Sequence, residues 1–227
     1  MRSNWTRDEV ILGLDVLISN EGKSLSIDSK AIIELSQLLN RLPLIPISKR
    51  NEKFRNVAGV RRQLLTFEWS LRNKKKASHV GQMFYTVFSE YNGNLIELQN
   101  IAQAIRRNEI SIHEMGGCIF DETINFPEGN ILHSLHRHLE WREGARFQKE
   151  SKKCAVCFIQ PEQIYGSLAI THFFETHLLV PPIKLSPNLD FINDDFITVC
   201  PNCHRMLHQY RPWLSRNRCK EILLTMR

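Results

Sequence analysis

Four cysteines near the C-terminus occur as two closely spaced pairs. Cys154 and Cys157 form the first pair, and Cys200 and Cys203 form the second. Each CxxC pair places two thiolates on one tight turn, and four thiolates complete a tetrahedral zinc site. The spacing therefore predicts a structural Zn²⁺, with buried free thiols as the alternative. The stretch between the pairs is longer than in a simple zinc ribbon, so we expect it to hold structure of its own.

Three histidines around the second pair predict another metal site. His204 and His208 lie four residues apart, which places both imidazoles on one face of a helix. His177 lies in a strand-like run over residues 173–181, and residues 196–199 predict a second strand. Three imidazoles that leave coordination positions open are typical of a catalytic metal site. We expect a divalent cation there, with Mg²⁺, Mn²⁺, Ni²⁺, Co²⁺ and Zn²⁺ as the candidates.

A further predicted helix, residues 131–153, is rich in histidine and arginine. His133, His136 and His138 suggest a metal, but the last two are only two residues apart and cannot share a helix face. We therefore interpret this segment as a polar helix beside DNA phosphates or simply in solvent. Its arginines are candidates for contact with nucleic acid, and they are Arg137, Arg142 and Arg146.

Positive charge is concentrated between residues 49 and 76. The chain carries a formal charge of +6, and this segment holds ten basic residues against two acidic ones, so the remainder is slightly acidic. Such a patch favours a polyanion, most often nucleic acid, and the alternative is a solvated surface. The residues predicted to contact nucleic acid here are Lys49, Arg50, Lys53, Arg55, Arg61, Arg62, Lys74, Lys75 and Lys76.

The N-terminal part reads as helical. Thr6 and Glu9 form a capping-box pattern that starts the first helix. Apolar residues at helical spacing predict four more helices, at 28–40 with Asp28 as N-cap, 57–71, 80–90 and 95–107. The fold class expected is α+β. Residues 1–110 would form a basic helical domain, residues 111–153 a connector with the polar helix, and residues 154–227 a small zinc-stabilised ββα domain.

The composition limits the class of protein and its expected location in the cell. The chain has 227 residues, 42% of them hydrophobic, which is enough apolar matter for a core. No apolar run is long enough to span a membrane, and Asp8, Glu9 and Asp15 interrupt the N-terminal apolar stretch that a signal peptide would need. The sequence therefore predicts a cytoplasmic protein, in which the six cysteines serve as metal ligands or buried thiols.

Residues 154–208 resemble an HNH nuclease of the zinc-knuckle, McrA-like kind. The resemblance lies in CAVC, YGSL, ETHLLVP and DDFITVCPNCHRMLH. It implies a ββα-metal fold in which the four paired cysteines bind structural zinc and His177, His204 and His208 bind the catalytic cation. Asp195 takes the position that braces the hairpin loop. Residues 5–10, 54–60 and 126–129 resemble segments found with HNH domains in restriction-type endonucleases.

One position departs from the family pattern. Leu178 stands where the family has the histidine that takes a proton from the attacking water. Such a general base typically raises the rate of hydrolysis by about 10²–10⁴-fold. We favour a gapless register, in which restoring histidine at 178 should raise cleavage. With a one-residue insertion, His177 would be the base and Thr176 would face the metal. His172 could substitute only if the strand bulged.

The resemblance implies a restriction-type DNA endonuclease that hydrolyses phosphodiester bonds in double-stranded DNA, with modified cytosine as one candidate target. Because one ββα site cuts one strand, a homodimer is the expected arrangement for double-strand cleavage. The alternative is a DNA-binding protein whose HNH domain is degenerate and hydrolyses weakly. A zinc module of the transcription-factor kind explains the cysteines but leaves His177, His204 and His208 without a role.

Overall fold

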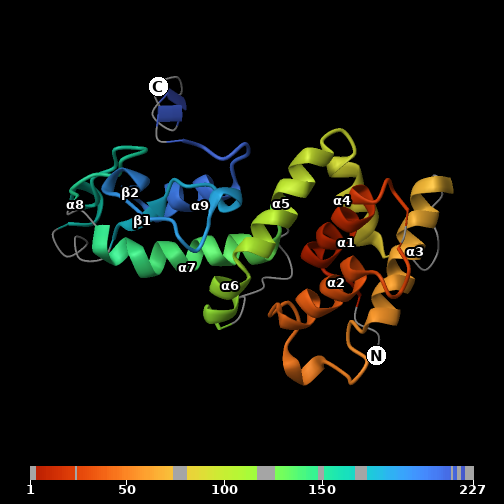
Figure 1. Cartoon of the computed structure of the whole chain (residues 1–227). Helices are drawn as coiled ribbons and strands as arrows, with labels where there is room; N and C mark the ends of the chain where they lie inside the picture. The colour runs from red at the N-terminus through yellow and green to blue at the C-terminus, as the bar shows by residue number, and fades with distance from the viewer. Residues whose placement is uncertain are drawn as a thin grey trace. The chain divides into compact units, whose positions relative to one another are not determined.

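The computed structural model describes residues 4–23, 25–73, 81–116, 126–147, 151–166, 173–215, 217–218 and 221–222. The described residues form helices and one two-stranded antiparallel sheet, which is an α+β composition (Figure 1). The chain divides into two compact units, Met1–Leu135 and His136–Arg227. This division differs from the predicted boundaries at residues 110 and 153. None of the described helices is long and apolar enough to cross a membrane.

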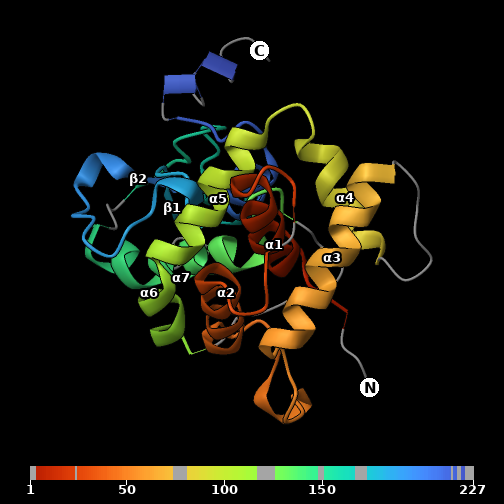
Figure 2. The same cartoon turned by 45° about the vertical axis from the view of Figure 1, so that its right-hand side comes forward.

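The first unit is built around its N-terminal helix. Helix α1 contacts α2, α3, α4 and α5, and Figure 2 shows it between those helices. The elements of this unit are α1 (Arg7–Ser19), α2 (Lys30–Arg41), η1 (Ile47–Lys49), α3 (Val57–Asn73), α4 (Gln82–Tyr91), α5 (Leu95–Arg107) and α6 (Glu109–Glu114). The five predicted helices are confirmed with small shifts at their ends. Helix α2 begins later than expected because Ser29, not Asp28, accepts the hydrogen bond from the Ile32 amide.

Three consecutive charged residues open α1, and all three are buried. Thr6 and Glu9 make the predicted capping box, and Glu9 also pairs with Arg55 at 2.5 Å. Arg7 pairs with Glu90 and donates to the carbonyl of Pro127. Because buried charges need partners, these residues stabilise the helical unit rather than face a ligand.

Asp8 caps a second helix that is distant in the sequence. Its carboxylate accepts the backbone N–H groups of Asn130 and Ile131, at 3.3 and 3.2 Å, at the start of α7 (Asn130–Phe147). Burial raises the pKa of Asp8 to about 6. A Cβ atom on Gly129 would lie 2.3 Å from Asp8 Oδ1, and the φ of Gly129 is +87°, so only glycine fits there.

The second unit contains the sheet. Its elements after α7 are α8 (Pro161–Tyr165), β1 (Glu175–Leu178), η3 (Pro182–Lys184), η4 (Asn193–Asp195), β2 (Phe196–Val199) and α9 (Pro201–Gln209). Strands β1 and β2 pair antiparallel, with His177 opposite Ile197. The predicted second strand is confirmed, and the first is shorter than the run 173–181. Helix α9 packs on β1.

Helix α7 differs most from expectation. Its last described residue is Phe147, and residues 148–150 lie outside the described part of the chain. The interpretation of this segment as a solvated polar helix is wrong, because His136, Glu140 and Glu143 are buried. The amphipathic pattern misleads here because the buried face of the helix is polar. Such a face must meet compensating partners.

Candidate functional site

The four paired cysteines form one cluster, as predicted. The sulfur atoms of Cys154, Cys157, Cys200 and Cys203 lie within 4.8 Å of one another. The Cys157 and Cys200 sulfurs are 3.7 Å apart. Zinc–sulfur bonds of about 2.3 Å in a tetrahedron place the sulfurs about 3.8 Å apart, so this cluster fits Zn²⁺. Cys118 and Cys219 lie outside the described residues.

Backbone amides favour a thiolate at one member of the cluster. The amides of Val156 and Cys200 point at the Cys154 sulfur from 3.4 and 3.2 Å. Burial alone would raise the pKa of Cys154, but these N–H groups outweigh it and lower the pKa. Burial raises the pKa of Cys200 and Cys203. A cation is what allows all four to be thiolates at once.

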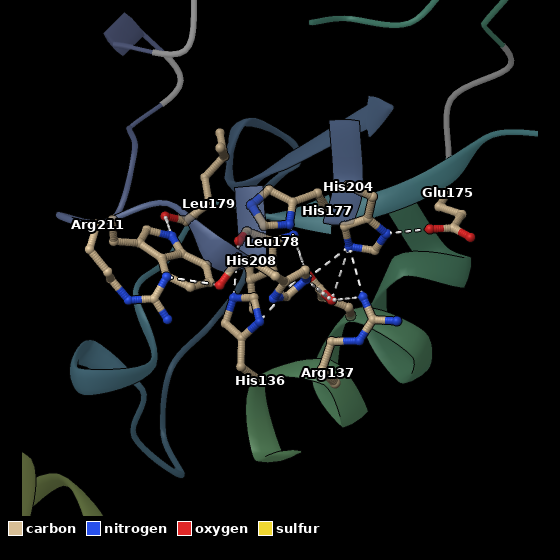
Figure 3. Close-up of polar contacts among 11 residues, drawn as sticks. His136, Arg137, Glu175, His177, Leu178, Leu179, His204, His208 and Arg211 are labelled. Atoms are coloured by element: carbon tan, nitrogen blue, oxygen red, sulfur yellow. Dashed lines mark hydrogen bonds and ion pairs between the residues drawn. The ribbon is translucent and has the colours of Figure 1, made fainter. Parts of the chain in front are cut away.

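A second group of metal-binding side chains lies in the same unit. It consists of Glu140, His177, His204 and His208, whose ligand atoms also lie within 4.8 Å of one another. Nε2 of His208 lies 3.0 Å from Glu140 Oε2 and 3.0 Å from His204 Nε2. Nδ1 of His177 lies 2.8 Å from Glu140 Oε1. Figure 3 shows the side chains of His177, His204 and His208 gathered together. We refer to the four residues as the His/Glu cluster.

The chemistry of the His/Glu cluster fits a cation. All four side chains are buried, and three imidazoles share one carboxylate. Despite the 2.8 Å distance, His177 Nδ1 makes no hydrogen bond, because its geometry toward Glu140 is unsuitable. A buried nitrogen without a hydrogen bond is costly, and coordination to a cation would compensate it.

The protonation states also suit a metal. Burial lowers the pKa of His208 to about 4 and lowers that of His177. Burial alone would raise the pKa of Glu140, but the surrounding imidazoles, led by His136, hold it well below its ordinary value. Near neutral pH His177 and His208 are therefore neutral and Glu140 is ionised, which are the forms that bind cations.

Three elements position the cluster. Strand β1 supplies His177, α9 supplies His204 and His208 one turn apart, and α7 supplies Glu140. The three histidines were predicted and the structure brings them together. Glu140 was missed. The available signal was its place four residues after His136, which puts both on one face of a helix.

An outer carboxylate orients one ligand. Oε2 of Glu175 lies 2.5 Å from Nδ1 of His204, whose Nε2 faces the cluster. A carboxylate that accepts the far N–H of an imidazole fixes the tautomer and leaves the other nitrogen free to bind a metal. Glu175 comes from the same strand as His177, two residues earlier, so both side chains lie on one face of the sheet.

The cluster is reached from an open pocket of about 390 Å³. Its polar lining includes Glu140, Glu175, His204 and Arg137. One guanidinium nitrogen of Arg137 lies 3.1 Å from His204 Nε2 and 3.4 Å from Glu140 Oε2 (Figure 3). A fixed positive group beside a candidate cation site suits an anionic ligand such as a phosphate.

Leu178 lies outside this pocket. Its side chain is fully buried, and its backbone amide donates to Glu140 Oε1 at 3.0 Å. His177 belongs to the His/Glu cluster, whereas the side chain of Thr176 lies against Gly144. Thr176 also lines the pocket, so the choice between the two registers stays a prediction. His172 lies outside the described residues.

Asp195 is not brought to the cluster. Its carboxylate accepts the backbone N–H of Ile192 at 2.9 Å, three residues earlier. Its backbone carbonyl accepts the amide of Leu179 at 2.7 Å, which links the ends of β1 and β2. The hairpin brace expected at this position therefore comes from the backbone of Asp195, and its side chain stabilises the local turn.

Two residues of the predicted basic patch have roles within the fold. Arg50 donates to the carbonyls of Asn40, Leu42 and Ile45, at the C-terminal end of α2 and just beyond it. Arg55 pairs with the buried Glu9. The remaining described side chains divide by exposure: Lys49, Lys53 and Arg62 are exposed and Arg61 is half-buried. Lys74, Lys75 and Lys76 lie outside the described residues.

The predicted arginines of α7 lie in the second unit. Arg137 reaches the His/Glu cluster, as described above. Arg142 and Arg146 are exposed, and both pair with Glu143, at 2.7 and 3.0 Å. The structure therefore brings one of the three arginines to the candidate site.

Comparison of the chain with models of protein families, with curated proteins and with solved structures finds no match.

Proposed function

We propose that the protein is a divalent-cation-dependent endonuclease of the HNH type that hydrolyses phosphodiester bonds in DNA. The observation that carries the proposal is the His/Glu cluster, of which Glu140 and His204 line an open pocket together with Arg137. Strand β1 supplies His177, and helix α9, which follows β2, supplies His204 and His208, in the order that the resemblance implies. A cation bound there would polarise a phosphoryl oxygen and stabilise the leaving oxygen.

Individual residues around the cluster would then have separate roles in hydrolysis. Arg137 would hold a phosphate oxygen through its guanidinium group. Glu175 would keep the proton on Nδ1 of His204, so that Nε2 stays available as a ligand. Leu178 offers no proton acceptor, so we expect hydrolysis about 10²–10⁴-fold slower than with a general base in place.

A second candidate rests on the burial of Leu178. The position that should meet the attacking water has no exposed surface, and its backbone is bonded to Glu140. The protein would then be a DNA-binding protein that keeps the metal site and hydrolyses weakly or not at all. In that case the exposed side chains of Lys49, Lys53 and Arg62 would contact DNA phosphates.

The test is cleavage of methylated and unmethylated plasmid with each candidate cation, Mg²⁺, Mn²⁺, Ni²⁺, Co²⁺ and Zn²⁺. His208→Ala is the control, since it removes a cluster ligand. Cutting by the wild-type protein that His208→Ala abolishes supports the nuclease. Absence of cutting with every cation, together with DNA retarded in a gel shift, supports the binding protein.

A further inference from the structure

An exposed tryptophan lies at the edge of the candidate site. Trp141 of α7 is 79% exposed, although tryptophan is among the side chains that gain most from burial. It lies four residues after Arg137 and four before Ala145, and all three line the pocket. Their spacing puts them on one face of α7. The helix thus presents a cationic group, an aromatic ring and a small residue in order along the pocket.

The pocket lining combines two kinds of side chain. The charged and ligating ones are Arg137, Glu175 and the cluster residues Glu140 and His204. The aromatic and small ones are Trp141, Gly144, Ala145 and Phe174. Gly144 packs against Thr176, to which an added Cβ would come within 3.1 Å, and Thr176 also lines the pocket. A ligand that suits both kinds of side chain has an anionic group and a flat ring.

We infer that this pocket takes one unpaired nucleotide, with its base stacked on Trp141 and its phosphate between Arg137 and the cation site. The inference rests on the proposed function and specifies its substrate. The pocket volume of about 390 Å³ is within the range of small-ligand sites. In a regular duplex both faces of a base are covered by its neighbours, so an indole can stack only on a base that has left the stack. The preferred substrate is thus a single strand, a flap or a mismatched site.

The test measures binding without added divalent cation, using a 12-nucleotide single strand that carries 2-aminopurine and the duplex of the same sequence. We expect the wild-type protein to quench the 2-aminopurine in the single strand and to bind that strand more tightly than the duplex. Trp141→Ala should weaken single-strand binding about 5- to 100-fold and abolish the quenching, because one base–aromatic stack is lost. Duplex binding should change less than about twofold.

Two further variants make the result specific. Trp141→Phe keeps an aromatic face and should bind the single strand within about threefold of wild type. Tyr165→Ala removes another exposed aromatic of the same unit, 62% exposed and outside the pocket, and should have no effect. Unchanged single-strand binding by Trp141→Ala, or wild-type protein that prefers the duplex, would overturn the inference. Failure of the proposed nuclease shows separately, as a single-stranded oligonucleotide and a plasmid that both stay uncut with every candidate cation although oligonucleotide binding is normal.

Discussion

The Nδ1 atom of His204 lies 2.5 Å from Oε2 of Glu175, on the side of the imidazole away from the His/Glu cluster. Replacing Glu175 with glutamine removes the charge but keeps the shape, so the His204 tautomer is no longer fixed. We expect cation affinity to fall about 10- to 100-fold, as for other outer-shell carboxylates. Isothermal titration of the metal-free cluster with Mn²⁺ or Co²⁺ measures this. An unchanged affinity would show that Glu175 has no part in orienting His204.

Glu140 should be a direct ligand. Glu140→Gln is expected to lower cation affinity at the His/Glu cluster about 100-fold or more, because the carboxylate is the cluster's one anionic ligand. Glu143→Gln is the matched control, since Glu143 is also buried on α7 but pairs with Arg142 and Arg146. Equal metal content in the two variants, measured by elemental analysis, would contradict this assignment.

The cysteine cluster should be needed for the second unit to fold. The apolar core around it consists of Val156, Ile197, Val199, Leu207 and Leu214 besides two of the cysteines. So small a core gives little stability alone. Cys203→Ser should lose about one zinc per chain and much of the ordered structure of this unit, measured by elemental analysis and circular dichroism. Cys118→Ser, outside both CxxC pairs, is the control and should keep its zinc.

The burial of Leu178 changes the expectation for a histidine at this position. Leu178→His would place an imidazole where the leucine side chain has no exposed surface. We expect a loss of about 2–4 kcal/mol in stability, from lost packing and a buried polar group, and no gain in cleavage. Thermal melting and the plasmid assay measure the two effects. Faster cleavage would mean that the end of β1 opens to substrate.

Asp8 should make the first unit more stable in mild acid. Its ordinary pKa is 3.8 and burial raises it to about 6, so the folded state holds a proton that the unfolded state releases. The stabilisation is complete below pH 3.8 and is lost as pH rises through 6, a change of about 3 kcal/mol.

Asp8→Asn keeps a side-chain oxygen for the α7 amides and has no proton to exchange. The wild-type protein should therefore lose stability relative to Asp8→Asn between pH 4 and 7, measured by denaturant unfolding at several pH values. Parallel profiles for the two proteins would rule out Asp8 as the source of the change.

Local signals in the sequence predicted much of the structure. The capping box at Thr6 and Glu9 starts α1 as expected, and the spacing of His204 and His208 places both in one cluster. These features depend on residues three or four apart, which a helix brings together whatever surrounds it.

The missed features depend on contacts between distant segments. The sequence predicts Glu140 at the surface, because buried helix faces are usually apolar. Its burial is favourable because the folded chain brings His177 and His208 into contact with its carboxylate. Arg50 and Arg55 read as part of a cationic surface. In the structure Arg50 bonds to the end of α2 and Arg55 pairs with Glu9, so both stabilise the fold. A count of charges along the sequence does not identify these partners.

The two candidate metal sites are nested in the sequence, since Glu140 and His208 bracket the segment from Cys154 to Cys203. A cation at each cluster would act as a cross-link between distant parts of the chain. Zinc at the cysteines closes the loop from Cys154 to Cys203. This shortens the free chain between Glu140 and His208, and bringing the ends of a shorter chain together costs less entropy. Zinc at the cysteines should therefore help the second cation to bind. The yield of folded protein in a cell would then depend on zinc supply as well as on the rate of synthesis.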